Sequence, residues 1–548
     1  MLLVNATARV ITRAMDAISA LCTTFLRPWN LILALIIYGA YKILYQLVIW
    51  PRFLSPLRLL PGPPLGSLLS GQFPVILAEE AGSPQRRWLK EYGPVVRVVG
   101  PIGIERLIFI KPEALQQILI TDWSDFPRPD FYRHALGLVV GYGLFTVKGG
   151  ESKWMRKIMN PAFSNTRLIP HIDPCYDIID EYVDTLSSEI DEDSTGGKTY
   201  VIHNLMTKLT LDILCLTAFG YKANNLSRFE GSIAEAYEEL FDLQSGPHIA
   251  SFCFGVCLPF VPAFMTSGWA HLFKPLFRLS DDLRRGGIIA DKMHHIKNIA
   301  NRMLDERRAD LEAAPLEDRK DLMSILLQSQ CTEKAGKARS SNADMVDHIL
   351  TFLGAGHDTT SSSLTWTLWL LAKHKSAQIK LREEVTALVS KNPRPDHRSL
   401  KESPFLEAVI MESLRLYPPL PQTVRQAAKD TEVDGIFVPK GTMIYVPIRV
   451  FNTWEGYWGE NAEEFRPERW QDLPGTYNST LSMLAFTAGP QACIGRTMAM
   501  MEMRAILTIL IMRFQFDLLD PNQNAIPRAG ISMKPTDSLP LRVTKINT

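Results

Sequence analysis

Helical periodicity dominates the pattern of apolar and polar positions along the chain. Apolar residues recur at spacings of three and four, as in amphipathic helices, over 113–119, 153–159, 174–190, 202–218, 232–243, 281–308, 343–374 and 400–417. Short apolar stretches bounded by turn residues indicate strands at 95–99, 106–110, 436–438 and 443–446, and again near the C-terminus. The segment 308–341 reads as a charged loop around one apolar stretch, 322–327. The sequence therefore predicts a mainly α fold with small peripheral β-sheets.

An apolar run near the N-terminus predicts one transmembrane helix. Residues 29–50 contain a single charged side chain, Lys42, and have a tryptophan at each end. A helix of this length extends about 33 Å, enough to cross a hydrocarbon core of about 30 Å. A buried core helix is the alternative interpretation. We therefore expect an N-terminal segment (1–28), an anchor (29–50), a hinge (51–66) stiffened by prolines, and one large domain (67–548).

A second uncharged run covers 249–270, but Pro259 and Pro262 interrupt it. A loop or short helix that dips into a membrane surface or covers an apolar pocket is the favoured interpretation, and a second membrane span is the alternative. Its phenylalanines predict a hydrophobic entrance and a lipophilic ligand. They are Phe252, Phe254, Phe260 and Phe264.

Composition removes several classes of function. The chain has 548 residues and a net charge of +1, so its body has no general attraction for phosphates, and nucleic acid is not an expected partner. Its 7 cysteines are scattered without a CxxC pair. This distribution excludes a disulfide scaffold and a zinc ribbon, and it suits a reducing compartment.

The segment 486–495 reads FTAGPQACIG and precedes a helical pattern. Gly489 and the proline after it impose a bend before Cys493, and Gly495 stands where the helix begins. The sulfur of Cys493 is therefore expected at the positive end of a helix, which lowers a thiol pKa and suits a thiolate bound to a metal. A buried structural cysteine in a turn is the alternative interpretation.

The middle of the long helix over 343–374 reads GAGHDTT at 354–360. Two glycines there weaken the helix by about 1 kcal/mol each, and they let a flat ligand or another backbone approach closely. Asp358 lies beside Thr359, and an acid next to a hydroxyl can relay protons. The string lacks the third glycine of a dinucleotide motif. His357 is expected to be a satisfied or solvent-facing histidine rather than a metal ligand.

Glu412 and Arg415 stand three residues apart, a spacing that places both side chains on one helix face. Alone, such a pair is usually a solvated surface ion pair. A segment reading EFRPERW follows at 464–470 and contains Arg469.

Together these segments resemble the cytochrome P-450 family, and the N-terminal anchor resembles its microsomal eukaryotic members. The resemblance implies a b-type haem whose iron is bound by Cys493, in a loop that includes Phe486, Gly489 and Gly495. It also implies an acid–alcohol pair of Asp358 and Thr359, and a structural triad of Glu412, Arg415 and Arg469 behind the haem loop.

Three further positions are interpreted through the same resemblance. Arg156 and Arg425 match residues that usually bind the haem propionates. Gln491 stands where the family usually has a basic residue, so one propionate would lack a cationic partner there. Ser152 occupies the position of a tryptophan that is frequent in the family, so Trp154 is not that residue.

The function implied is that of a haem-thiolate monooxygenase, which inserts one atom of O2 into a lipophilic terpenoid, steroid, fatty acid or aromatic molecule. Electrons would come from NADPH through a partner cytochrome reductase, in secondary or xenobiotic metabolism. The resemblance also implies a single-pass protein of the endoplasmic reticulum with its catalytic domain in the cytosol. A haem-thiolate isomerase or dehydratase that needs no O2, and a haem-binding sensor without turnover, are the alternatives, and the Asp358–Thr359 pair argues against both. Glycosylation sequons begin at Asn5, Asn225 and Asn478.

Overall fold

The computed structural model describes residues 28–225, 232–242, 261, 280–313, 321–332, 341–473, 475, 477–530, 532–536 and 539–546. It divides into two compact units, residues 1–73 with 97–106, and residues 74–96 with 107–548. Most of the second apolar run, including its four phenylalanines, lies outside the described residues, as does the sequon at Asn5. Asn225 is fully buried. Asn478 is exposed.

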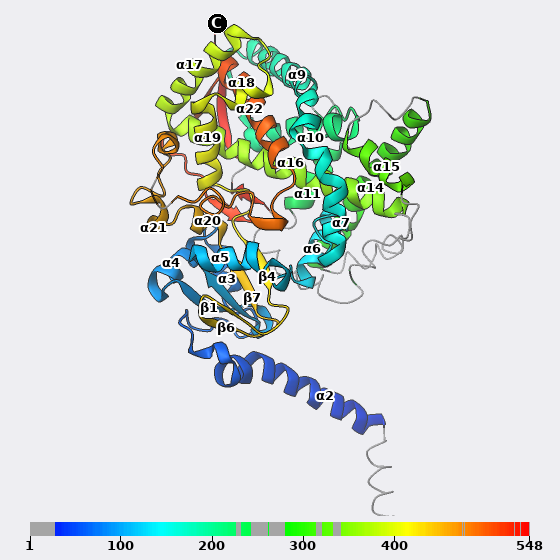
Figure 1. Ribbon diagram of the computed structural model, residues 1–548, viewed down its shortest axis with the longest axis vertical. Coiled ribbons are helices and arrows are strands. Elements are labelled where there is room, and N and C mark those ends of the chain that lie inside the picture. The colour runs from blue at the N-terminus through cyan, green and yellow to red at the C-terminus, as the bar shows by residue number, and fades with distance from the viewer. Residues whose placement is uncertain are drawn as a thin grey trace, which may run out of the picture. The chain divides into compact units, whose positions relative to one another are not determined.

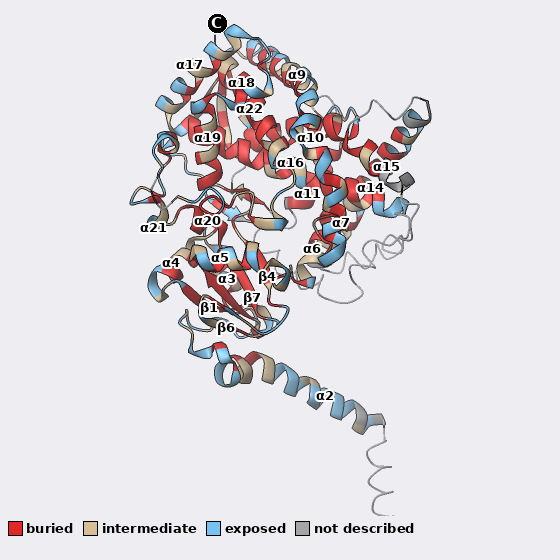
Figure 2. Cartoon of the chain, in the orientation of Figure 1, coloured by how far each residue is buried: buried red, intermediate tan, exposed pale blue. Residues whose placement is uncertain are grey.

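The first unit holds the predicted anchor. An α-helix, α2 (Pro28–Leu44), continues as a π-helix, η1 (Tyr45–Leu54). The helical structure therefore runs four residues past the predicted end at Trp50, because a π-helical turn accommodates Pro51, which has no N–H to donate. Residues Ile32–Leu54 are long and apolar enough to cross a membrane, with a mean hydropathy of 1.9. Their side chains are mostly exposed (Figure 2).

A buried carboxylate within the first unit joins the end of this helix to residues 97–105. Glu105 forms an ion pair of 2.7 Å with Arg97. It also accepts hydrogen bonds from the indole of Trp50 at 3.0 Å and the hydroxyl of Ser55 at 2.6 Å. The base of the predicted anchor is therefore held by directional bonds. From Leu60 to Gly66 the chain is not helical, as its prolines predict.

The second unit is mainly helical, as predicted (Figure 1). Helix α16 (Asn342–Lys373) runs through its centre, and almost its whole length is buried (Figure 2). A side chain of Ser341 caps its first turn in a capping box with Asp344. Its other long helices are α6 (Asp130–Val140), α7 (Gly149–Met159), α9 (Ile172–Asp191), α10 (Ile202–Phe219), α11 (Ile233–Asp242), α14 (Asp281–Ala313), α17 (Lys375–Lys391), α19 (Pro404–Leu416) and α22 (Arg496–Arg513).

The sheets are small, as predicted. One has the strand order β1-β2-β7-β4 and another the order β3-β11-β8, and two further sheets pair β5 with β6 and β9 with β10. The strands are β1 (Val95–Val99), β2 (Glu105–Phe109), β3 (Gly197–Val201), β4 (Thr423–Gln426), β5 (Thr431–Val433), β6 (Ile436–Val438), β7 (Met443–Val446), β8 (Phe514–Leu518), β9 (Pro527–Ala529), β10 (Met533–Pro535) and β11 (Pro540–Lys545).

One predicted loop is a helix. The apolar stretch at 322–327 begins α15 (Leu322–Thr332), although the sequence predicted a charged loop there. Leu322, Met323, Leu326 and Leu327 are all buried. Burial of this apolar face stabilises a helix whose pattern is too short to identify it from sequence.

Candidate active site

The loop that carries Cys493 is built by a tight turn and a helix start. A 3₁₀ turn, η13 (Gly489–Gln491), precedes the cysteine, and Gly495 is the N-cap of α22. The amide N–H of Cys493 donates a hydrogen bond of 2.9 Å to the carbonyl oxygen of Phe486. The phenylalanine ring lies 5.5 Å from the guanidinium of Arg496. The structure therefore brings together all four loop residues that the sequence analysis selected.

Gly489 is required by both its conformation and its surroundings. Its φ is +75°, a region that favours glycine. A Cβ atom there would lie 2.2 Å from the carbonyl oxygen of Leu119. Any other residue at 489 would therefore push the loop away from the segment that contains Leu119.

The electrostatics of Cys493 differ from the prediction. Burial raises the pKa of its thiol. The backbone N–H groups of Gly495 and Arg496 face the sulfur and act to lower the pKa, as does the charge of Arg156, but burial outweighs them. The predicted lowering was therefore wrong for the thiol by itself. The residue as a whole is nevertheless exposed over part of its surface.

The predicted triad forms one buried cluster. Glu412 and Arg415 are fully buried, and both oxygens of the carboxylate accept from the guanidinium at 2.9 Å. Arg469 Nε donates to Glu412 Oε1 at 3.1 Å. The indole of Trp470 and the amide of Arg466 also donate to this carboxylate, at 3.1 and 2.9 Å.

Asn452 connects this cluster to the cysteine loop. Its carbonyl oxygen accepts from Arg415 Nη1 at 3.1 Å, and its side-chain oxygen accepts from the amide of Leu484 at 2.8 Å. Leu484 in turn accepts from the amide of Thr487, at 2.8 Å. Asn452 could not be predicted from sequence, because an asparagine in an apolar stretch resembles any buried amide.

In the second unit, Arg128 lies close enough to both Arg425 and Arg156 to repel them. Arg425, on β4, is buried, and burial followed by the charge of Arg128 lowers its pKa to about 9. Burial also lowers the pKa of Arg128, and Arg156 on α7 adds to that shift. Among the described residues, no carboxylate forms an ion pair with any of the three. The sequence analysis predicted Arg156 and Arg425 but missed Arg128, which stands in no periodic element.

Gln491 lines a cavity of about 130 Å³ together with Arg128, Lys148 and Lys153. Its side-chain Oε1 is buried and has no hydrogen-bond partner. The position that departs from the family pattern therefore lies beside one of the three arginines.

The two members of the predicted acid–alcohol pair do not contact each other. Thr359 is partly exposed, and its hydroxyl donates to the carbonyl of Ala355, four residues back in α16, at 2.9 Å. Asp358 is buried, and its carboxylate lies 3.2 Å from the ammonium of Lys534. Successive helical residues point in directions about 100° apart, so adjacency in the sequence does not join these side chains.

The helix glycines lie against side chains of neighbouring helices. Cβ atoms on Gly354 and Gly356 would lie 2.6 Å from Val140 and 2.8 Å from Leu214. The glycines therefore make room for side chains of α6 and α10, and not for another backbone. His357 is buried with Nδ1 2.5 Å from the carbonyl of Leu353, while Nε2 has no partner, so it is only half satisfied.

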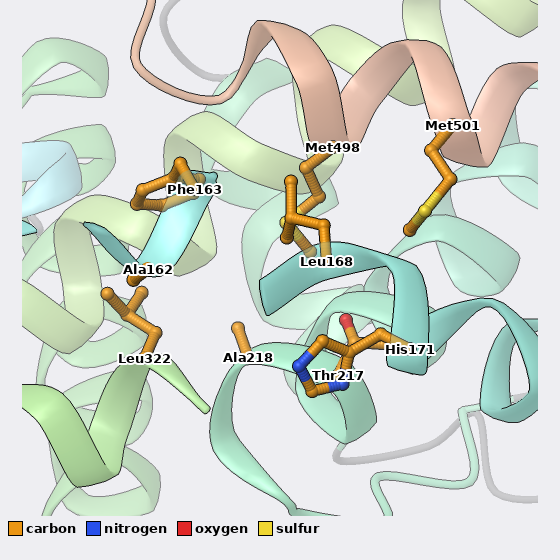
Figure 3. Close-up of a pocket in the computed structure, with 9 residues that line it drawn as sticks. All are labelled: Ala162, Phe163, Leu168, His171, Thr217, Ala218, Leu322, Met498 and Met501. Carbon is orange, nitrogen blue, oxygen red and sulfur yellow. The ribbon is translucent and has the colours of Figure 1, made fainter. Parts of the chain in front are cut away.

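A small cavity under α22 is not a substrate site. It has a volume of about 20 Å³, enough for one water molecule. Figure 3 shows Met498 and Met501 reaching down from the helix, with His171 and Thr217 below them. None of the predicted site residues lines it.

Comparison with known proteins agrees with this geometry. A family model described as Cytochrome P450 matches residues 61–539. The chain belongs to the cytochrome P450 family. It is 28% identical to cytochrome P450 monooxygenase sphH of Aspergillus fumigatus over 522 residues, which are 92% of this chain and 91% of that protein. It is 30% identical to cytochrome P450 monooxygenase 205 of Postia placenta over 509 residues, 88% of this chain and 90% of that protein. The chain is accordingly an oxidoreductase of the P450 class.

Membership of the P450 family implies haem held by a cysteine thiolate, and the described residues fit that group. The Cys493 side chain has two backbone N–H groups directed at it, and the residue is exposed over part of its surface. The buried Nε atoms of Arg128 and Arg156 have no hydrogen-bond partner. Half-buried guanidinium groups with a free Nε donor and no carboxylate partner among the described residues are suited to the two carboxylates of a haem.

Proposed function

We propose that this P450 is a haem-thiolate monooxygenase that inserts one oxygen atom of O2 into a lipophilic small molecule. The observation that carries the proposal is the Cys493 loop, with its hydrogen-bonded turn and the start of α22 directed at the sulfur. A b-type haem would be held by Cys493 and would supply O2 activation.

The chain's own residues then have distinct tasks. Glu412, Arg415 and Arg469 hold the backbone behind the loop through Asn452. Arg128, Arg156 and Arg425 bind the propionates, a role that their mutual repulsion without carboxylate partners supports.

Proton delivery is assigned to Asp358 and Thr359. Because the two side chains do not touch, a water molecule or a change of rotamer has to connect them. Thr359 is the member accessible to solvent, so it is the one suited to hold a water molecule through which a proton would pass.

We further propose that the protein is anchored once in the membrane of the endoplasmic reticulum, with the P450 domain in the cytosol. The exposed apolar segment Ile32–Leu54 supports an anchor. A membrane location also suits a lipophilic substrate and a membrane-bound reductase that draws on NADPH. Resistance of the full chain to alkaline extraction from microsomes, lost on deletion of residues 1–54, tests this part of the proposal.

The decisive test of the reaction is turnover with isotopically labelled O2. Full-length protein in microsomes with a P450 reductase and NADPH is incubated with a panel of terpenoids, steroids, fatty acids and aromatic compounds. A product carrying one labelled oxygen atom, formed only with NADPH, supports the proposal. A product formed without O2 would instead identify an isomerase or dehydratase. NADPH-independent haem binding without any product across the panel would favour a sensor.

A further inference from the structure

The ion pair between Asp358 and Lys534 has no counterpart in the sequence motifs. Lys534 lies on β10, more than 170 positions along the chain from Asp358 on α16. The two charged atoms are 3.2 Å apart, and only 16% of the Lys534 side chain and 4% of the Asp358 side chain are exposed. An ion pair this deeply buried is only weakly screened by solvent.

The position of Lys534 is fixed by its neighbour on the strand. The carbonyl oxygen of Met533 accepts hydrogen bonds from Ser362 at 2.8 Å and from the indole of Trp366 at 3.0 Å, and both donors belong to α16. The amide of Met533 donates to Pro419 at 2.7 Å. On its other side, the Lys534 ammonium lies 4.9 Å from the ring of Phe241 on α11. The lysine is therefore held between α16 and α11.

The groups around Asp358 come from three elements. His357 belongs to α16, His203 to α10, and Ser532 and Lys534 to the β10 segment. Burial lowers the pKa of both histidines, that of His203 to about 3, so both are neutral at physiological pH. Lys534 is thus the one full positive charge among these four neighbours.

Burial alone would raise the pKa of Asp358, but the net shift is downward, and Lys534 is the largest of the groups that lower it. Without the lysine, a carboxylate facing two neutral imidazoles would lose its strongest stabilising charge. The hydroxyl of Ser532 faces the same carboxylate and acts to lower its pKa. His203 Nδ1 and His357 Nε2 have no hydrogen-bond partner among the described atoms. These are polar atoms to which water can bind.

We propose that Lys534 is a positioning residue for proton delivery: it holds Asp358 ionised and directed toward β10, away from Thr359. This inference rests on the proposed role of Asp358 in the monooxygenase reaction. Asp358 then begins each cycle as a proton acceptor. A hydronium ion that arrives through solvent water protonates the carboxylate and leaves a water molecule, and the neutral acid binds Lys534 more weakly. The carboxyl group is thereby free to turn toward the hydroxyl of Thr359.

The test compares haem-loaded, full-length protein with Lys534→Met, Asp358→Asn and the double variant. The midpoint of thermal unfolding is measured from about pH 5 to about pH 8. In the parent protein Asp358 titrates below this range. The difference in unfolding midpoint between the parent and Asp358→Asn should therefore not change with pH. In the Lys534→Met background burial is no longer opposed by the lysine and raises the Asp358 pKa. The unfolding midpoint of Lys534→Met should therefore fall by several degrees relative to that of the double variant as pH rises.

Two further variants keep the test decisive. Lys534→Arg preserves the charge and restores the flat profile, which a loss of packing alone would not explain. Lys534→Gln replaces Lys534→Met if the latter does not accumulate. A flat profile in both uncharged variants would overturn the proposal. Because unfolding needs no turnover, this result is independent of whether any substrate is oxidised. In the turnover assay, Lys534→Met should change the pH dependence of product formed per NADPH, and Lys534→Arg should restore it.

Discussion

Arg415 and Glu412 form a two-pronged ion pair in which both N···O distances are 2.9 Å and neither side chain is exposed. The remaining hydrogen-bonding capacity of both groups is also used. The carboxylate accepts from Arg469, and the guanidinium donates to the carbonyl of Asn452. A buried pair of this kind stabilises the fold only while it remains complete.

Glu412→Gln is therefore expected to cost about 3–5 kcal/mol of unfolding free energy, the cost of leaving one member of a buried pair without its partner. The variant should unfold at a clearly lower denaturant concentration and accumulate less haem-loaded protein. Arg398→Ala is the matched control, because the ion pair of Arg398 with Glu402 is exposed. Equal stability of Glu412→Gln and the control would contradict the structural role of the triad.

Arg425→Gln should separate haem retention from stability of the apoprotein. A charge-assisted hydrogen bond contributes about 1.5–3 kcal/mol, so transfer of haem to an acceptor such as apomyoglobin should be faster by about tenfold or more. The apoprotein should become more stable, because a buried cation that is repelled by Arg128 has been removed. Faster haem loss without any gain in apoprotein stability would mean that the arginines do not repel one another.

Gln491→Arg makes the opposite change, adding a cation to the cavity that Gln491 shares with Arg128. It should slow haem loss, and it should reduce the effect of Arg425→Gln in the double variant, because both cations would serve the same carboxylates. Equal effects of Arg425→Gln in the two backgrounds would show that the positions are uncoupled.

Thr359→Ala should keep haem and substrate binding but divert NADPH electrons into hydrogen peroxide, lowering product per NADPH several-fold. Thr360→Ala is a close control. Its hydroxyl makes the same type of bond, 2.9 Å to the carbonyl four residues back, but the side chain is buried. Peroxide yields that rise equally in the two variants would point to a general disturbance of α16 and remove Thr359 from proton delivery.

Much of this site was readable from sequence because its signals are local. The loop around Cys493 depends on two glycines at fixed offsets, and the pair Glu412–Arg415 depends on one helical turn. Helices with a regular apolar face were predicted for the same reason, and the mainly α fold with its small sheets follows from them.

What the sequence did not reveal depends on contacts between distant segments. Lys534 and Arg128 stand in segments without a motif, and their importance appears only when the fold brings them to Asp358 and Arg425. Glycines at 354 and 356 suggested a close approach, but the partners turned out to be side chains of Val140 and Leu214. The rise in the Cys493 pKa likewise results from burial, which the sequence does not report.

Glu502 predicts a pH-dependent stability. It is buried in α22, its Oε1 has no hydrogen-bond partner, and burial raises its pKa to about 8. A carboxyl group whose pKa is higher in the folded protein than in the unfolded chain lowers the free energy of unfolding as pH rises. The loss takes place between the pKa of the unfolded chain and the pKa of the folded protein. The parent protein should therefore lose about 1.4 kcal/mol per pH unit relative to Glu502→Gln across this interval.

Denaturant unfolding of both proteins between about pH 5 and pH 8 checks this expectation. The Glu502→Gln variant should be the more stable near pH 8, and the two should converge toward pH 5. Parallel profiles would mean that Glu502 is already ionised in the folded protein.

The central claim is that Cys493 binds the haem iron, and the absorption spectrum of the reduced carbon monoxide complex tests it most directly. The parent protein should show the red-shifted Soret band that is characteristic of thiolate-ligated haem. Cys215→Ser is the control, because Cys215 is a buried cysteine of α10. The fraction of this variant that folds should keep the band. Cys493→Ser should lose it while any haem that remains bound absorbs at shorter wavelength. Persistence of the thiolate band in Cys493→Ser would contradict the account.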